Sequence, residues 1–183
     1  MALFYLVRHG EPDYDAVARL GFYGFGLNFA PLSEAGIRQA KQTAADPRLL
    51  EAELIVSSPY TRALQTAAIL ADVLHKEIVV EPGLHEWIND KTNTLSSDEE
   101  AARLFREFKE NKGVYPDGEE KRWETVASLQ ARVRRVADKY ATYNKVIFVA
   151  HGMVCKVLAR AERMSYAEII PCQYESGREV PFF

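Results

Sequence analysis

The sequence predicts a single α/β domain over residues 1–183, with a mainly parallel sheet flanked by helices on both faces. Short, continuously apolar runs recur along the chain, and such runs are typical of strands buried on both faces of a parallel sheet. Stretches with apolar residues at helical spacing lie between them, and alternating strands and helices build a doubly wound sheet with right-handed crossovers. A length of 183 residues suits one such domain and is short for two.

The strongest strand candidate is the run Lys-Val-Ile-Phe-Val-Ala at residues 145–150. Similar apolar runs occupy residues 3–7, 54–56 and 78–80, and we expect all of them to lie in the core of the sheet. The last part of the chain stays unassigned, because its prolines at 171 and 181 argue against a long helix there.

Helix start signals follow two of these strands. Ser58 before Pro59 is typical of an N-cap followed by proline at the first helical position, and apolar residues then recur at helical spacing. Ser97 with Glu100 forms a capping-box pattern ahead of another apolar face. Further helices are expected over 126–140 and, directly after the strongest strand, over 152–162.

Composition and charge exclude several classes of function. The chain has 23 basic and 26 acidic residues and a formal net charge of −3, so no overall basic field favours nucleic acid or a membrane surface. No apolar run approaches the roughly 20 residues that span a bilayer, and the N-terminus lacks the basic lead-in of a signal peptide. Cys155 and Cys172 are too few for a disulfide framework. We therefore expect a cytoplasmic protein with neither a nucleic-acid nor a membrane partner.

Charged and nucleophilic side chains follow the predicted strands where each strand ends. Arg8 and His9 come directly after the first strand, and Arg62 lies one helical turn beyond the second. Glu86 follows the third strand and His151 follows the fourth. Because ligands of open α/β sheets gather at the carboxyl ends of the strands, we expect these side chains to form one site. Two arginines, two histidines and one carboxylate at one edge indicate a site for a phosphoryl group.

These residue types suit phosphoryl chemistry. The guanidinium groups of Arg8 and Arg62 are permanently charged, and their planar forks match phosphate oxygens. A neutral imidazole can attack phosphorus and become a phosphohistidine, provided that its other nitrogen is held as a donor. A carboxyl group such as Glu86 can supply the proton that the leaving alkoxide needs. The arrangement requires neither a metal ion nor a cofactor.

The chain resembles the histidine phosphatase (phosphoglycerate mutase-like) superfamily. The resemblance covers residues from about 3 to 158 and lies in ordered blocks, of which the signature Leu-Val-Arg-His-Gly-Glu at 6–11 is the first. A tripeptide Arg-His-Gly alone is weak evidence, whereas several blocks in the family order are specific. The others are residues 31–40, 57–63 with 66–67, Glu86 in Leu-His-Glu-Trp, and 150–152.

The resemblance implies a role for each residue at the predicted site. His9 would be the nucleophile that accepts the phosphoryl group, while Arg8, Arg62 and His151 would bind it. Glu86 would protonate the leaving group and later act as the base for water. It also implies a mainly parallel sheet with flanking helices, in agreement with the apolar pattern. Glu86 has rivals for the acid role in two other carboxylates near the signature, at positions 11 and 15.

The chain departs from the family pattern at three positions. Pro12 follows the signature where the family often has Ser or Thr, and Asp15 stands where many members have Asn. Met153 replaces a common Gly or Asn after the second His-Gly, which leaves only its backbone N–H to serve a phosphate. The chain is also short for a cofactor-dependent phosphoglycerate mutase, whose insertions lie around the site.

We therefore predict a metal-independent phosphomonoester hydrolase that acts on a small phosphorylated metabolite. Two alternatives stay open, a phosphoglycerate mutase-type phosphotransferase and a non-catalytic module that binds a phosphorylated ligand. The role of the aromatic segment 11–31 is also open, since Phe22, Tyr23 and Phe25, with Trp87, could pack against a substrate or only anchor a loop. The sequence indicates neither the physiological substrate nor the oligomeric state.

Overall fold

A computed structural model describes residues 1–160, 163–178 and 180–183. Its strands form one 5-stranded sheet in the order β3-β2-β4-β1-β5. Neighbouring strands among β1 to β4 run parallel, and β5 pairs antiparallel with β1. This confirms the mainly parallel sheet, and the predicted runs all form strands. The strands are β1 (Ala2–Arg8), β2 (Leu54–Ser57), β3 (Ile78–Val80), β4 (Lys145–Ala150) and β5 (Ile169–Tyr174).

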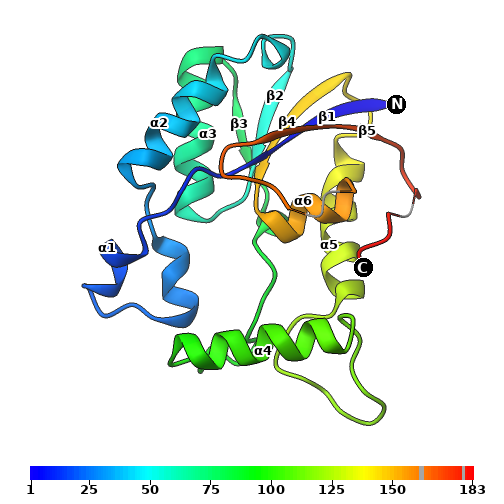
Figure 1. Cartoon of the computed structure of the whole chain (residues 1–183). Coiled ribbons are helices and arrows are strands. Elements are labelled where there is room, and N and C mark those ends of the chain that lie inside the picture. Colours follow the sequence, from blue (N-terminus) through cyan, green and yellow to red (C-terminus); the bar gives the residue numbers. More distant parts are fainter. Residues whose placement is uncertain (161–162, 179) are drawn as a thin grey trace.

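Helices cover both faces of the sheet, as predicted. In Figure 1, α2 and α3 lie on one side of the sheet and α5 and α6 on the other, while α4 lies across the end of the molecule toward which the chain leaves β3. The α-helices are α1 (Tyr14–Ala18), α2 (Glu34–Ala44), α3 (Thr61–Leu74), α4 (Asp98–Glu110), α5 (Val126–Lys139) and α6 (Gly152–Leu158). Short 3-10 turns are η1 (Gly24–Phe29), η2 (Pro47–Leu49) and η3 (Pro82–Leu84).

The central strands are apolar throughout because both of their faces are buried. In β1, Phe4 and Leu6 join the core that packs under α5 and α6, whereas Tyr5 and Val7 join the core under α3. Strand β4 alternates in the same way. This alternation follows from the two-residue repeat of a strand, and it fixes which way the residues after each strand can face.

One predicted helix start is correct and one is wrong. Ser97 caps α4 by accepting a hydrogen bond from the Glu100 N–H at 3.2 Å. The start predicted at Ser58-Pro59 is wrong, because α3 begins at Thr61 and its N-cap residue, Tyr60, makes no side-chain capping hydrogen bond. The Ser58 hydroxyl accepts from the Tyr60 N–H at 3.3 Å and also lies 2.7 Å from Nε2 of His151, and the second contact places it in the candidate site.

The helix predicted over 152–162 is shorter than expected. It ends at Leu158, and Ala159 is extended. Residues 161–162 lie outside the described part of the chain. Within the described ranges, none of the helices has the length and apolar character that crossing a membrane requires.

Candidate active site

Strand register brings two histidines together. Strands β1 and β4 are parallel neighbours in which Arg8 pairs with Ala150. The next residues, His9 and His151, therefore leave the sheet side by side, and their ring centroids lie 5.0 Å apart. Arg62, in the first turn of α3, places its Nε 3.2 Å from Nε2 of His9. The three side chains, predicted to meet from positions far apart in the sequence, are buried together.

The hydrogen bonds of His9 define its protonation state. Nδ1 lies 2.7 Å from the carbonyl oxygen of Gly10, which can only accept, so Nδ1 carries the proton. Nε2 receives the N–H of Arg62 and must offer its lone pair. The imidazole is therefore neutral, with an unprotonated Nε2 next to a guanidinium group.

Electrostatics support the neutral form of both histidines. Burial, followed by the positive charge of Arg62, lowers the pKa of His9 to about 3. Burial and then Arg62 also hold the pKa of His151 well below its usual value. A buried imidazolium beside a guanidinium would lose its hydration and gain only repulsion. Both rings therefore stay neutral, with one N–H each, at neutral pH.

His151 is held through one ring nitrogen. Its Nε2 contacts the Ser58 hydroxyl at 2.7 Å, and its ring meets that of Tyr60 with the centroids 5.2 Å apart. Its buried Nδ1 has no hydrogen-bond partner among the described residues. A buried polar atom without a partner is costly, so Nδ1 is suited to meet a polar ligand.

Arg8 extends from the end of β1 beneath the segment that leads into β5. Its guanidinium carbon lies 4.2 Å from the ring centroid of Tyr166, and Nη1 donates to the carbonyl oxygen of Met164. Its buried Nε also lacks a partner among the described residues. Tyr166 is not among the predicted site residues, since no motif or periodicity marks residues 165–183. Across residues 1–160, 163–178 and 180–183, no group of three or more His, Cys, Asp or Glu side chains could hold a metal ion.

Glu86 follows η3 and lies between α3 and α6. Its Oε1 accepts from the Trp87 N–H at 2.8 Å, and its Oε2 accepts from the Met153 N–H at 3.4 Å. Burial outweighs these bonds and raises the pKa of the carboxyl group. A raised pKa lets a carboxyl group keep its proton nearer to neutral pH, which is what a proton donor needs. The Met153 N–H, expected to serve a phosphate, contacts Glu86 here.

The two rival carboxylates are placed differently. Glu11 accepts from the Ser33 hydroxyl at 2.7 Å, which ties it to the start of α2. Asp15 lies exposed in the first turn of α1. Pro12, the residue that departs from the signature pattern, forms an isolated bridge with Leu32. These contacts make Glu11 and Pro12 part of the packing between the signature loop and α2.

Two small contacts fix the loop after β1. Thr66 of α3 accepts from the Gly10 N–H at 3.0 Å and donates to the Arg62 carbonyl at 2.8 Å, so one hydroxyl connects the loop that carries His9 with the turn that carries Arg62. Gly36 lies so close to this loop that a Cβ there would stand 2.1 Å from the Glu11 carbonyl oxygen. Glycine is required here by the close approach of two backbones.

Arg132 of α5 holds the loop that carries Glu86. Its Nη1 donates to the carbonyl oxygens of Gly83 and His85 at 2.8 and 2.7 Å, and its Nη2 donates to that of Glu86 at 3.1 Å. The Glu124 carboxylate accepts from Nε and Nη2, both at 2.8 Å, and so orients the guanidinium group. Sequence analysis did not single out Arg132, because nothing local in its helix distinguishes it from its neighbours.

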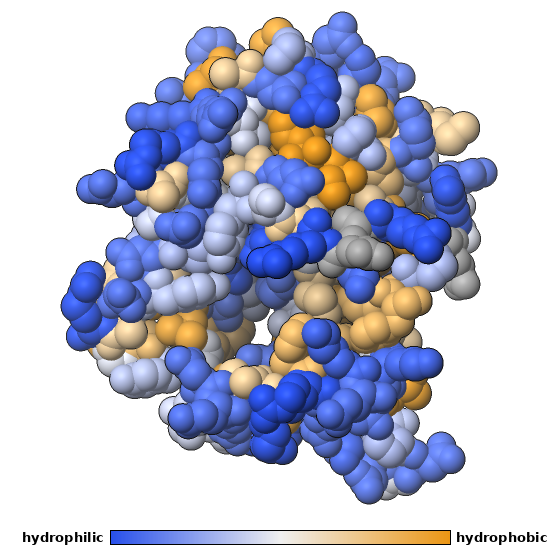
Figure 2. All heavy atoms as spheres, viewed as in Figure 1, coloured by the Kyte–Doolittle hydropathy of each residue, from blue (hydrophilic) through white to orange (hydrophobic). Residues whose placement is uncertain are grey.

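Two cavities border Glu86. We call the smaller one, of about 250 Å³, the first cavity; the α1–η1 segment, Tyr60 and the connection from η3 to α4 line it. The second cavity, of about 560 Å³, lies between Arg8, α4, α6 and the last residues of the chain. Figure 2 shows the surface hollowed between the α1–η1 segment and α4. Phe25 and Trp87 line the first cavity, whereas Phe22 packs on Phe29 with ring centroids 5.6 Å apart.

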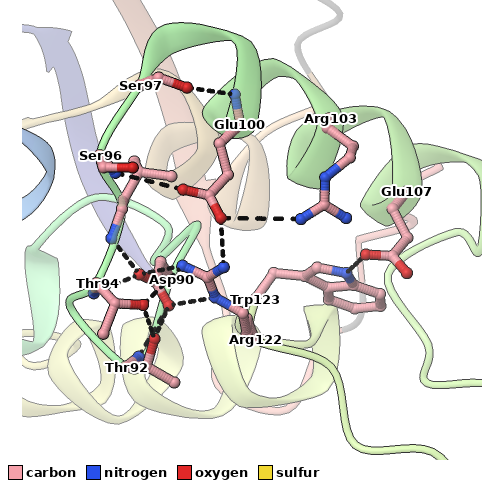
Figure 3. Close-up of polar contacts among 11 residues, drawn as sticks. Asp90, Thr92, Thr94, Ser96, Ser97, Glu100, Arg103, Glu107, Arg122 and Trp123 are labelled. Atoms are coloured by element: carbon pink, nitrogen blue, oxygen red, sulfur yellow. Dashed lines mark hydrogen bonds and ion pairs between the residues drawn. The ribbon is translucent and has the colours of Figure 1, made fainter.

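A polar network fixes the wall of the first cavity (Figure 3). Asp90 accepts from the N–H groups of Thr94 and Leu95 at 2.8 and 2.9 Å, and it pairs with the Arg122 guanidinium through two bonds of 3.0 and 2.8 Å. Arg122 also donates to Glu100 of α4 at 2.6 Å. The guanidinium group beside it keeps the pKa of Asp90 well below its ordinary value. The network therefore joins the loop after Glu86 to α4.

Comparison with known proteins gives the family. A model of the histidine phosphatase superfamily (branch 1) matches residues 4–175. The chain belongs to this superfamily, which contains phosphatases and mutases.

Individual relatives agree with this assignment. A probable phosphoglycerate mutase GpmB of Enterobacter sp. (strain 638) is 32% identical over 178 residues, which cover 92% of this chain and 79% of that protein. The structure of a mycobacterial glucosyl-3-phosphoglycerate phosphatase in complex with VO3 superposes with a TM-score of 0.64 at 25% identity. The superposed region covers 85% of this chain and 79% of that phosphatase. Bacillus stearothermophilus YhfR has the same fold, with a TM-score of 0.64 at 24% identity over 85% of this chain and 77% of its own.

Proposed function

We propose that this protein is a metal-independent phosphomonoester hydrolase that works through a phosphohistidine at His9. One observation carries the proposal, which is the neutral His9 ring whose Nδ1–H donates to Gly10 and whose Nε2 offers its lone pair beside Arg62. A nucleophile of this kind needs its second nitrogen fixed as a donor and a cation near the group that it attacks. The unpartnered Nε of Arg8 and Nδ1 of His151 add polar atoms that phosphoryl oxygens could satisfy.

In the first step, Nε2 of His9 attacks phosphorus. The N–P bond forms as the ester P–O bond breaks in line with it, while Arg8, Arg62 and His151 stabilise the equatorial oxygens. The Glu86 carboxyl group gives its proton to the departing alkoxide, which leaves as the free alcohol. The products are phosphohistidine and a Glu86 carboxylate.

In the second step, water replaces the alcohol. The Glu86 carboxylate takes a proton from the water molecule as its oxygen attacks phosphorus, and the N–P bond breaks. Inorganic phosphate leaves, His9 returns to its neutral form, and Glu86 is protonated again. The two steps balance without a metal ion or an external cofactor.

Hydrolysis of p-nitrophenyl phosphate in the presence of a chelator tests this proposal. The wild-type protein should release p-nitrophenolate, and rapid acid-free quenching of a reaction with ³²P-labelled ester should trap label on His9. The variant His9→Asn should lose both turnover and label. A matched control is His75→Asn, which changes the histidine in the left-handed position that ends α3; asparagine tolerates that conformation.

Each result is decisive. Turnover and labelling that persist in His9→Asn, or turnover that stops when chelator is added, would refute the phosphohistidine route. Tight binding of vanadate without hydrolysis of any phosphoester would identify a non-catalytic module that binds a phosphorylated ligand.

A second candidate is a mutase, favoured by the relative named as a probable phosphoglycerate mutase. A mutase must return the phosphoryl group from His9 to another hydroxyl before water reaches it. Incubation with 3-phosphoglycerate distinguishes the two reactions, because a hydrolase releases inorganic phosphate whereas a mutase forms 2-phosphoglycerate. Predominant isomerisation would replace our first proposal.

A further inference from the structure

The second cavity borders the candidate active site. It is lined at one end by Arg8 and Glu86, residues to which we assign phosphoryl binding and proton donation. From there it extends between α4 and the start of α6, where Gly152 and Met153 line it. Its volume of about 560 Å³ falls in the range of small-molecule sites. An alcohol that leaves at Glu86 could therefore occupy it.

Aromatic rings form much of the wall of this cavity. Phe105 and Phe108 come from α4, and Phe182 and Phe183 come from the end of the chain. The rings of Phe108 and Phe183 lie with centroids 5.6 Å apart, which joins the two parts of the wall. Phe105 is 37% exposed and Phe183 is 54% exposed, so apolar surface is available to an occupant.

Cationic side chains line the cavity together with these rings. Lys109 of α4, Lys156 of α6 and Arg163 all line the cavity, in addition to Arg8. Lys109 Nζ lies 4.9 Å from the ring centroid of Phe105. Lys156 Nζ lies 4.9 Å from the ring centroid of Phe182 and 5.4 Å from that of Phe183. In the described part of the chain, no carboxylate comes within the 4.0 Å of an ion pair to Lys109, Lys156 or Arg163. Among the residues that the structure describes, the cations of this wall therefore have no carboxylate partner at ion-pair distance.

The first cavity lacks this cationic lining. Its lining contains Asp90 and Glu86 together with Asn28, Asn89 and Asn93, and among the described residues it includes neither Lys nor Arg. Both cavities reach Glu86, so a leaving alcohol has two directions in which to extend. A negative group on that alcohol would meet cations in the second cavity, whereas the first cavity offers it none among its lining residues, and the Asp90 carboxylate there is already paired with Arg122.

We propose that the second cavity binds the alcohol portion of the substrate and selects phosphomonoesters that carry a second anionic group, recognised by Lys109 and Lys156. This deepens the proposed function and rests on it. The rings would contact the carbon frame, and the lysines would exchange their ring contacts for an anion. The substrate class is therefore a phosphoester with an apolar frame and a carboxylate or a second phosphate.

The helix that presents Lys109 is well anchored. Arg122 donates to Glu100 in its first turn, and Glu107 accepts from the Trp123 indole N–H at 3.2 Å (Figure 3). Trp123 is fully buried. Phe105 and Lys109 thus project from a helix that is anchored at both Glu100 and Glu107. A wall that is already fixed loses little conformational entropy when a ligand binds.

Two matched esters test this inference, phenyl phosphate and 4-carboxyphenyl phosphate. The wild-type protein should show a higher kcat/KM for the carboxylated ester, chiefly through a lower KM. In the double variant Lys109→Gln/Lys156→Gln this preference should fall by about tenfold, since an exposed ion pair contributes up to roughly fivefold each. The ratio between the two esters cancels their different intrinsic reactivity. Lys41→Gln, an exposed lysine on α2, is the matched control and should keep the wild-type ratio.

The outcomes separate this inference from the proposed function. Hydrolysis of both esters with one unchanged ratio in all variants would overturn the inference and leave the hydrolase standing. If neither ester is hydrolysed, titration calorimetry of both esters still measures the preference in binding. A preference that the double variant loses would then support the cationic subsite, and equal affinities would overturn it.

Discussion

The Nε of Arg62 donates to Nε2 of His9 at 3.2 Å. Nε2 is the atom that we assign as nucleophile, and the same guanidinium group would stabilise the phosphoryl group that it attacks. Arg62 stands in the first turn of α3, where the helix macrodipole disfavours a cation. It is also buried, at 4% exposure. A guanidinium group kept in such a place is suited to an anionic partner, and the phosphoryl group provides one.

Arg62→Lys should lower kcat on p-nitrophenyl phosphate by about 10²–10³-fold, because lysine keeps the charge but cannot hold His9 and a phosphoryl oxygen with one planar fork. Steady-state kinetics measure the effect. Arg38→Lys, an exposed arginine of α2, is the control and should retain normal turnover. A near-normal rate in Arg62→Lys would show that the planar fork is not needed.

The pH dependence of kcat/KM should reveal Glu86. Its pKa is raised, so the carboxyl group stays protonated at pH values above the ordinary pKa of a glutamate side chain and loses its proton only at higher pH. An alkyl ester such as glycerol 3-phosphate needs that proton, whereas p-nitrophenolate leaves without it. The ratio of kcat/KM between the alkyl ester and p-nitrophenyl phosphate should therefore fall with increasing pH.

In the variant Glu86→Gln this ratio should be about 10²–10⁴-fold lower than in the wild type, and it should not depend on pH. Glu11→Gln removes the rival carboxylate that contacts Ser33 and should keep the wild-type profile. If the profile moves with Glu11 instead, the proton donor has been misassigned.

Stability should decrease as the pH falls below 6.5. His9 remains neutral in the folded protein because its pKa is lowered to about 3, whereas the unfolded chain takes up a proton near pH 6.5. Protons therefore favour the unfolded state throughout this window, and the loss attributable to His9 at pH 5 is about 2 kcal/mol.

Urea denaturation at pH 7.5 and pH 5.0, in buffers free of phosphate and sulfate, measures this loss. The variant His9→Asn should lose less stability between these two pH values than the wild type, by about the same 2 kcal/mol. His75→Asn should behave like the wild type. Equal losses in all three proteins would show that His9 is not a buried neutral imidazole.

Arg132 should act as a positioning residue for Glu86. Arg132→Lys cannot donate to three carbonyl groups and a carboxylate together, so the loop that carries Glu86 should shift. We expect kcat/KM for glycerol 3-phosphate to fall by about tenfold or more while that for p-nitrophenyl phosphate changes little, because only the former needs the proton.

Arg135→Lys, an exposed position on the same helix, is the control for Arg132. A merely structural role would lower both activities together, along with the midpoint of urea denaturation. Only a selective loss on the poor leaving group, with a displaced pH profile, agrees with positioning of Glu86.

Much of the fold could be predicted because local sequence carries it. Continuous apolar runs mark strands buried on two faces, and the cap at Ser97 is a local hydrogen bond within one helical turn. Strand β5 is not among the predicted elements, because Pro171 argued only against a long helix there and no apolar pattern marked a strand. At the edge of the sheet, next to β1, a proline is tolerated since its missing N–H would face away from the ladder.

The sequence by itself determined that the strands are mainly parallel and that His9 and His151 lie at the same edge of the sheet, because the carboxyl ends of parallel strands meet there. That β1 and β4 are neighbours in register, and so place the two rings side by side, was decided by the tertiary structure. Only the tertiary structure decided the partners of these rings: the hydroxyl of Ser58, read locally as a helix cap, lies against His151. It also decided the support of Glu86 by Arg132 and the cationic wall of the second cavity. These contacts join segments distant in the chain, and no local pattern encodes a contact that depends on how whole elements pack.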